Sequence, residues 1–165
     1  MRPILLNSCA RAATAKEARF RIDAPIAPAR ATRVVALDGA AESVVRRVAE
    51  QPWADARFFT ARAGNGSADL ADIVLVDTDG AETRLSEVLT GADVAVMVAT
   101  DNNGAAAASA IGDACTLRGI MTAGLVLAGG HDTGAAVSAL RPHARVIMVT
   151  QDEHDVSEVL TALRA

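Results

Sequence analysis

Hydrophobic and polar positions follow one another along the chain in blocks that predict strands alternating with helices. Continuous apolar runs, such as 94–99, are typical of strands that are buried on both faces. Between these runs, apolar residues recur at helical spacing, as they do over 156–163. The pattern predicts an α/β fold: a three-layer α/β/α domain with a mainly parallel, doubly wound sheet and right-handed crossovers.

The same pattern places the individual elements. Strands are expected at 33–37, 57–60, 73–76, 94–99, 120–128 and 146–149. Helices are expected to run up to Gln51, up to Arg118, through Leu140 to the stop at Pro142, and over 156–163. After the turn predicted at Asp79-Gly80, the stretch 82–89 fits a returning strand or a short helix, and we favour a helix over 85–89.

The first 32 residues differ from the rest of the chain. They are rich in Arg and Ala, contain Pro3, Pro25 and Pro28, and show weak periodicity, although 20–22 fits a short edge strand. We therefore expect an N-terminal arm at 1–32 and a single α/β domain at 33–165. The arm and the Ala/Val-rich surface make a homo-oligomer a candidate assembly.

Composition narrows the class of protein. The chain has 165 residues, 51% of them hydrophobic, and a net charge of −4, so it can bury a core without disulfides or metal. The acidic balance and the presence of one Trp and three Phe as the only aromatic residues argue against a nucleic-acid surface. No apolar stretch approaches the ~18 residues of a membrane span, so no membrane association is expected.

The cysteines favour a cytoplasmic protein. Cys9 and Cys115 are far apart and belong to no Cys/His cluster, which argues against a zinc site. The apolar run before Cys9, at 4–6, is shorter than the roughly 7 residues that an export signal needs. Cys115 falls on the apolar face of its helix and is expected in the core.

The candidate binding residues lie in the turns that follow the parallel strands, because ligands of open α/β sheets bind beyond the carboxyl ends of the strands. Four turns are expected at that edge, at 38–39, 100–104, 129–134 and 151–154. The first three contain glycine and so suit the approach of backbone N–H groups to an anion. Asp38 is expected to cap the helix that follows it, at a turn that lacks a GxGxxG motif.

The turn at 100–104 stands out because it holds three adjacent Asx residues. One of Asp101, Asn102 and Asn103 is expected to cap the next helix, which would leave the other two as free side chains. His131 and Asp132 form a second candidate pair, since a carboxylate next to a glycine-flanked histidine can tune it near neutral pH.

Other sites are weaker. Asp152 is expected to cap the last helix, and His154 in its first turn to be solvated. Asp77 and Asp79 could join Asp38 on a metal, but a hairpin turn is the favoured interpretation and no metal site is predicted. The only lysine is Lys16, so a Walker-type ATPase is excluded, and no cofactor is identified.

Residues 82–128 resemble the central nucleotide-binding segment of the tubulin/FtsZ family. The resemblance lies in the order of 85–93, the strand at 94–99, a small-residue turn, a helix, and the strand that follows Gly119. It implies a phosphate loop at 100–106, where the family has GGGTGTG and this chain keeps only Gly104. Asp101 would bring a negative charge toward a triphosphate, which is unfavourable without a metal.

These departures imply a changed function. The family's hydrolysis loop belongs to a second domain, so assembly-stimulated GTP hydrolysis is not expected. We expect a non-catalytic binding or assembly module, with a nucleotide or another phosphate-bearing small molecule as candidate ligand. The alternative is a small enzyme or phosphate-ligand-binding protein, since 94–100 is also similar to the strand and phosphate loop of phosphosugar isomerases. The candidate ligand-binding residues are Asp38, Gly39, Asp101, Asn102, Asn103, Gly104, Gly130, His131 and Asp132.

Overall fold

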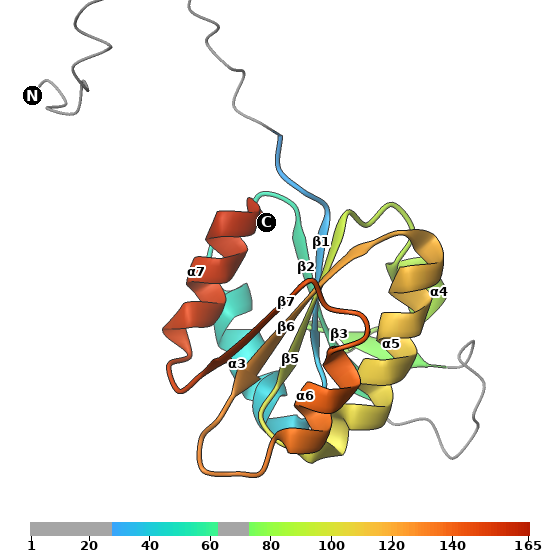
Figure 1. The fold of residues 1–165 in the computed structure, drawn as a ribbon. Helices are drawn as coiled ribbons and strands as arrows, with labels where there is room; N and C mark the ends of the chain where they lie inside the picture. The colour runs from blue at the N-terminus through green and yellow to red at the C-terminus, as the bar shows by residue number, and fades with distance from the viewer. Residues whose placement is uncertain (1–27, 63–72) are drawn as a thin grey trace, which may run out of the picture.

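The computed structural model describes residues 28–62 and 73–165, and these form one seven-stranded sheet with helices packed on it (Figure 1). The strands are β1 (Thr32–Ala36), β2 (Ala56–Arg62), β3 (Val74–Asp77), β4 (Glu82–Arg84), β5 (Val94–Ala99), β6 (Met121–Leu127) and β7 (Val146–Thr150). The helices are α3 (Gly39–Ala49), α4 (Leu85–Val88), the 3-10 turn η2 (Asn102–Gly104), α5 (Ala105–Arg118), α6 (Gly134–Leu140) and α7 (His154–Leu163).

The sheet is mixed. Its strand order is β4-β3-β2-β1-β5-β6-β7. Strands β2, β1, β5, β6 and β7 pair in parallel, whereas β3 runs antiparallel to both β2 and β4. The predicted α/β class is confirmed, but a parallel arrangement describes only part of the sheet, because a tight hairpin rather than a crossover helix connects β3 to β4.

Helices cover both faces of the sheet. Val35 of β1 and Leu37, which directly follows β1, join a core cluster with Ile111 of α5 and Leu140 of α6. The alternate residues of β1 join a second cluster that includes residues of α3 and α7. Figure 1 shows the same division, with α3 and α7 on one side of the sheet and α4, α5 and α6 on the other. Burial on both faces explains why the central strands are continuous apolar runs.

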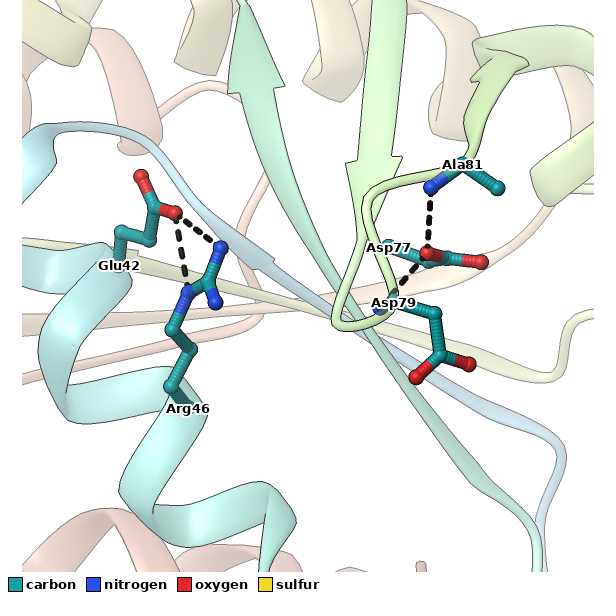
Figure 2. A network of polar contacts seen from close by, with 5 residues as sticks. All are labelled: Glu42, Arg46, Asp77, Asp79 and Ala81. Carbon is teal, nitrogen blue, oxygen red and sulfur yellow. Dashed lines mark hydrogen bonds and ion pairs between the residues drawn. The ribbon is translucent and has the colours of Figure 1, made fainter.

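The segment 82–89 contains both of the alternatives that its pattern allows. Glu82–Arg84 returns as β4, and α4 begins at Leu85, as favoured, with Leu85 and Val88 buried. The turn between β3 and β4 is closed by Asp77, whose Oδ1 accepts hydrogen bonds from the N–H groups of Asp79 and Ala81, each at 2.9 Å (Figure 2). Gly80 supplies the positive φ of 88°. The predicted turn at Asp79-Gly80 is therefore confirmed.

Local interactions favour α3 as the first crossover helix. The Asp38 side chain caps its N-terminus, as predicted, and Arg46 pairs with Glu42 one turn away at 2.7 Å (Figure 2). Its apolar residues Val44, Val45 and Val48 are buried against the sheet. The predicted strand at 20–22 and loop at 64–67 lie outside the described residues.

A charged residue is buried at the opposite end of β1 from the carboxyl edge. Arg33 is 6% exposed, and its Nε donates to the Val88 carbonyl at 3.0 Å. Desolvation by burial lowers the pKa of its guanidinium, and Arg57 lowers it further, while Asp55 and Asp93 raise it.

In the part of the chain that the structure describes, no helix is long and apolar enough to cross a membrane.

Candidate functional site

The carboxyl ends of the parallel strands bring the predicted turns to one edge of the sheet. Strands β1 and β5 are neighbours, but the segments that follow them diverge. The helix after β1, α3, packs on one face of the sheet, and the helix after β5, α5, packs on the other. A divergence of this kind opens a crevice in many α/β proteins, and ligands bind there. In this chain the crevice is spanned by hydrogen bonds.

Asp38 is the centre of that hydrogen bonding. Its Oδ1 accepts from the Ala41 N–H at 2.8 Å and from the Thr100 hydroxyl at 2.6 Å. Its Oδ2 accepts from the N–H groups of Thr100 at 2.7 Å and Asp101 at 3.3 Å. Asp38 is 7% exposed, so one buried carboxylate caps α3 and holds the loop after β5. The predicted cap is confirmed, and the bridge to the second loop is an addition to it.

The Asx residues of 101–103 are all engaged within the protein. Asp101 caps η2 by accepting from the Asn103 N–H at 2.7 Å, and its Oδ2 accepts from Asn103 Nδ2 at 2.8 Å. Asn102 reaches the start of α6, where its Oδ1 accepts from the N–H groups of Ala135 and Ala136 at 2.8 and 3.1 Å. The expectation that two of the three would be free side chains is wrong, because the neighbouring helix α6 supplies donors that sequence spacing does not reveal.

Glycine suits the three candidate glycine positions for different physical reasons. A Cβ on Gly104 would lie 2.8 Å from the Leu37 carbonyl oxygen and closer still to Leu37 Cβ, so glycine allows the loop after β5 to pack on the end of β1. Gly130 is exposed and has φ of 97°, a conformation that favours glycine. Gly39 meets nothing within 4 Å and starts α3.

His131 and Asp132 diverge in their surroundings. His131 lines a cleft, whereas Asp132 Oδ1 accepts from the Gly134 N–H at 2.9 Å and so forms a local turn before α6. No hydrogen bond or ion pair among the described residues joins the two side chains. Both residues are exposed, but the structure places only His131, and not Asp132, in the lining of the cleft.

The cleft lies beside the hydrogen-bonded crevice, on the α3 side of the sheet. It has a volume of about 360 Å³ and lies between α3 and the loops after β5, β6 and β7. One stripe of α3 faces it, formed by residues 40, 43, 44 and 47, which share the i, i+3, i+4, i+7 spacing of a helix face. The polar residues that line it are Ser43, Arg47, Thr100, His131, Gln151 and Glu153.

An exposed ion pair lines this cleft. Arg47 of α3 and Glu153, just before α7, are 2.7 Å apart, with exposed fractions of 56% and 54%. Both side chains are accessible, so a ligand can compete for either charge at little cost in stability. Sequence reasoning did not single out Ser43 or Arg47, although their spacing on a helix that follows a strand end was an available signal.

The described residues offer no established catalytic arrangement. Cys115 is buried in the core, as predicted, and burial raises the pKa of its thiol, which disfavours the nucleophilic thiolate. His143 lies 3.7 Å from Asp113, at the α5 helix and away from the cleft. Within 28–62 and 73–165, no group of three His, Cys, Asp or Glu side chains is positioned to hold a metal, and Asp77 and Asp79 serve the β3–β4 turn.

Comparison with models of known protein families and with curated proteins finds no match to this chain.

Proposed function

We propose that this protein is a non-catalytic binding or assembly module that resembles a reduced FtsZ-type nucleotide domain, with carboxylates of the chain itself replacing a bound phosphate. The observation that carries the proposal is the hydrogen bonding of the loop after β5. The N–H groups of Thr100 and Asp101 donate to Asp38, and that of Asn103 donates to Asp101. In a phosphate loop, such donors point at the ligand.

Charge supports the same conclusion. A phosphate brought to this loop would approach the carboxylates of Asp38 and Asp101 and would have to displace them from their donors. Repulsion between like charges and the loss of those hydrogen bonds both oppose binding. The loop is stable without a ligand because its donors are already satisfied by side chains.

The test is nucleotide binding and hydrolysis by the full chain. Thermal unfolding, followed by the fluorescence of the single Trp53, is measured with GTP, GDP and ATP, with and without Mg²⁺. A ligand at 100 times its Kd stabilises by about 2.7 kcal/mol and would raise the midpoint by roughly 5 to 11 °C. We expect no shift and no phosphate release. A Mg²⁺-dependent GTPase activity that Asp101→Ala abolishes would contradict the proposal.

A second candidate function rests on the open cleft. Its polar lining is that of a site for a small polar or phosphate-bearing molecule, bound at the strand ends by Ser43, Arg47 and His131. Thermal unfolding against phosphosugars and inorganic phosphate tests it, with His131→Ala and Arg47→Ala as the variants and Asn103→Ala as a probe of the neighbouring loop. If a ligand binds and neither His131→Ala nor Arg47→Ala weakens it, the cleft is not the site.

A further inference from the structure

The two edges of the sheet are protected to very different degrees. At one edge, β4 has three residues and carries Glu82 and Arg84, and short length and charge both discourage pairing with another strand. At the other edge, β7 has the sequence VIMVT, five residues without a charge or a proline. Among residues 28–62 and 73–165, β7 pairs with β6 alone, and an uncharged strand with one open side is a template for a further strand.

Apolar side chains are exposed on both faces of β7. Val146 is 60% exposed and Val149 is 55% exposed, and because side chains alternate along a strand they lie on opposite faces of the sheet. On the α7 side, Val146 and Met148 also line an apolar groove of about 160 Å³ together with Val159 and Leu163. The apolar surface therefore continues from the unpaired edge onto the sheet face beside α7.

The charges that flank β7 have opposite signs at its two ends. Arg145 precedes the strand and is exposed, whereas Asp152 and Glu153 follow it and are exposed. Two β7 strands side by side in the same direction would place like charges together. Two strands in opposite directions, centred on Met148, would place each Arg145 opposite Gln151 and one residue from Asp152 of the other copy.

We infer that β7 pairs antiparallel with β7 of a second copy about a two-fold axis near Met148, so that two sheets become one. This inference names the partner of the proposed assembly module and rests on that proposal. In this pairing Met148 faces its own counterpart, Val149 lies opposite Ile147 of the second copy, and Val146 lies opposite Thr150. A two-fold axis forms each contact twice, which doubles the effect of every matched pair.

The first test is the mass of the full chain in solution, measured by sedimentation velocity over a range of concentrations. The expected species has twice the 16.9 kDa of one chain. Val149→Lys and Val146→Lys each place a charge on the edge of β7. Val149→Lys removes two Val149–Ile147 pairs per dimer and Val146→Lys removes two Val146–Thr150 pairs, so we expect each to raise the dimer Kd by about tenfold or more. Both positions are exposed, so the fold tolerates the change.

Leu117→Lys is the matched control. Leu117 is 82% exposed, on α5, and is the third large hydrophobic exposed among the described residues. Its substitution removes at least as much exposed apolar surface as Val149→Lys but lies away from β7, so the dimer should persist. Loss of the dimer in Leu117→Lys together with its survival in Val149→Lys would place the interface elsewhere and overturn the inference.

Charge reversal tests the direction of pairing. Arg145→Glu should weaken the dimer by repulsion from Asp152 of the other copy, and Arg145→Glu with Asp152→Arg should restore it. In a Cys9→Ser background, Met148→Cys should form an intermolecular disulfide on oxidation, because facing residues of antiparallel strands have Cα atoms about 4.5 to 5.5 Å apart, within the range of disulfides. No rescue and no cross-link would contradict antiparallel pairing.

A chain that stays monomeric up to about 100 μM, roughly a hundredfold above a Kd of 1 μM, would overturn the inference outright. That outcome leaves the nucleotide experiment unaffected. Conversely, a dimer that dissociates with Val149→Lys but also binds GTP would keep the β7 interface and reject the proposed function, so the two failures are distinguishable.

Discussion

The loops after β1 and β5 and the loops after β6 and β7 lie at the same edge of one sheet but use their polar groups differently. The first pair is closed: the Asp38 carboxylate takes donors from both loops and is 7% exposed. The second pair is open: together with α3 and Thr100 it borders a cleft of about 360 Å³, and the ion pair in that cleft, Arg47 of α3 with Glu153, is more than half exposed.

The difference indicates that stability and binding are assigned to separate parts of this edge. A buried carboxylate with four donors resists substitution, because each donor left unpaired in the interior costs free energy. An exposed ion pair contributes little to stability and can change partners. We therefore expect substitutions in the closed pair of loops to unfold the protein, and substitutions in the open pair to leave its stability almost unchanged.

The largest effect is expected for Asp38→Ala. The substitution removes the α3 cap and leaves the Thr100 N–H and hydroxyl and the Asp101 N–H without their acceptor. We expect a loss of about 3 to 5 kcal/mol in the free energy of unfolding, measured by urea denaturation. Asp38→Asn keeps one acceptor oxygen and should fall between this variant and the wild type. A loss below about 1 kcal/mol would remove the distinction between the two regions.

Gly104→Ala sharpens the comparison by testing packing in the closed region. The added Cβ would press on Leu37, including its backbone oxygen at 2.8 Å, and neither loop can move away without breaking hydrogen bonds to Asp38. We expect a loss of about 2 to 3 kcal/mol, measured in the same way. Gly39→Ala is the control, because nothing lies within 4 Å of its added Cβ, and its stability should stay within about 0.5 kcal/mol of the wild type.

Asn102→Ala should have an intermediate effect. It removes the acceptor for the N–H groups of Ala135 and Ala136 at the start of α6. Loss of a helix cap costs about 1 kcal/mol, and thermal or urea unfolding would detect it. Asn102→Asp retains the acceptor and should be close to the wild type. Equal losses in the two variants would show that the amide group, rather than the cap, matters.

The smallest change in stability is expected for the open region. Arg47→Ala and Glu153→Ala each break an exposed ion pair with side chains 56% and 54% exposed, so unfolding free energies should change by less than about 1 kcal/mol. If the cleft binds a ligand, the same substitutions should change its affinity. A large loss of stability in either variant would mean that the cleft is a structural element.

Sequence patterns predicted most of the elements because the strands are continuous apolar runs. The run at 94–99 became β5 with those bounds, and the helix favoured at 85–89 starts at Leu85. Strand direction was harder to predict from the sequence. The run at 73–76 became β3, which is antiparallel to both of its neighbours, because the hairpin after it fixes its direction. The buried Arg33 was also missed, because its partner, the Val88 carbonyl, is 55 residues away.

The candidate site was predicted in part. The cap by Asp38 follows from local sequence, as caps are decided within one turn of a helix. The bonds from Thr100 to Asp38 and from Ala135 to Asn102 span 62 and 33 residues, so they depend on strand order and helix packing that no local pattern specifies. The cleft was missed for the same reason, since α3 and the loop after β7 meet only in the folded sheet.

The central claim is that carboxylates of the chain, and not a nucleotide, satisfy the loop after β5. The most direct measurement follows the backbone amide resonances of Thr100, Asp101 and Asn103 by heteronuclear NMR during titration with GTP and Mg²⁺. The account predicts that these three resonances stay in place in the wild type and that Asp38→Asn shifts those of Thr100 and Asp101 without added ligand. Saturable movement of all three with GTP in the wild type would contradict it.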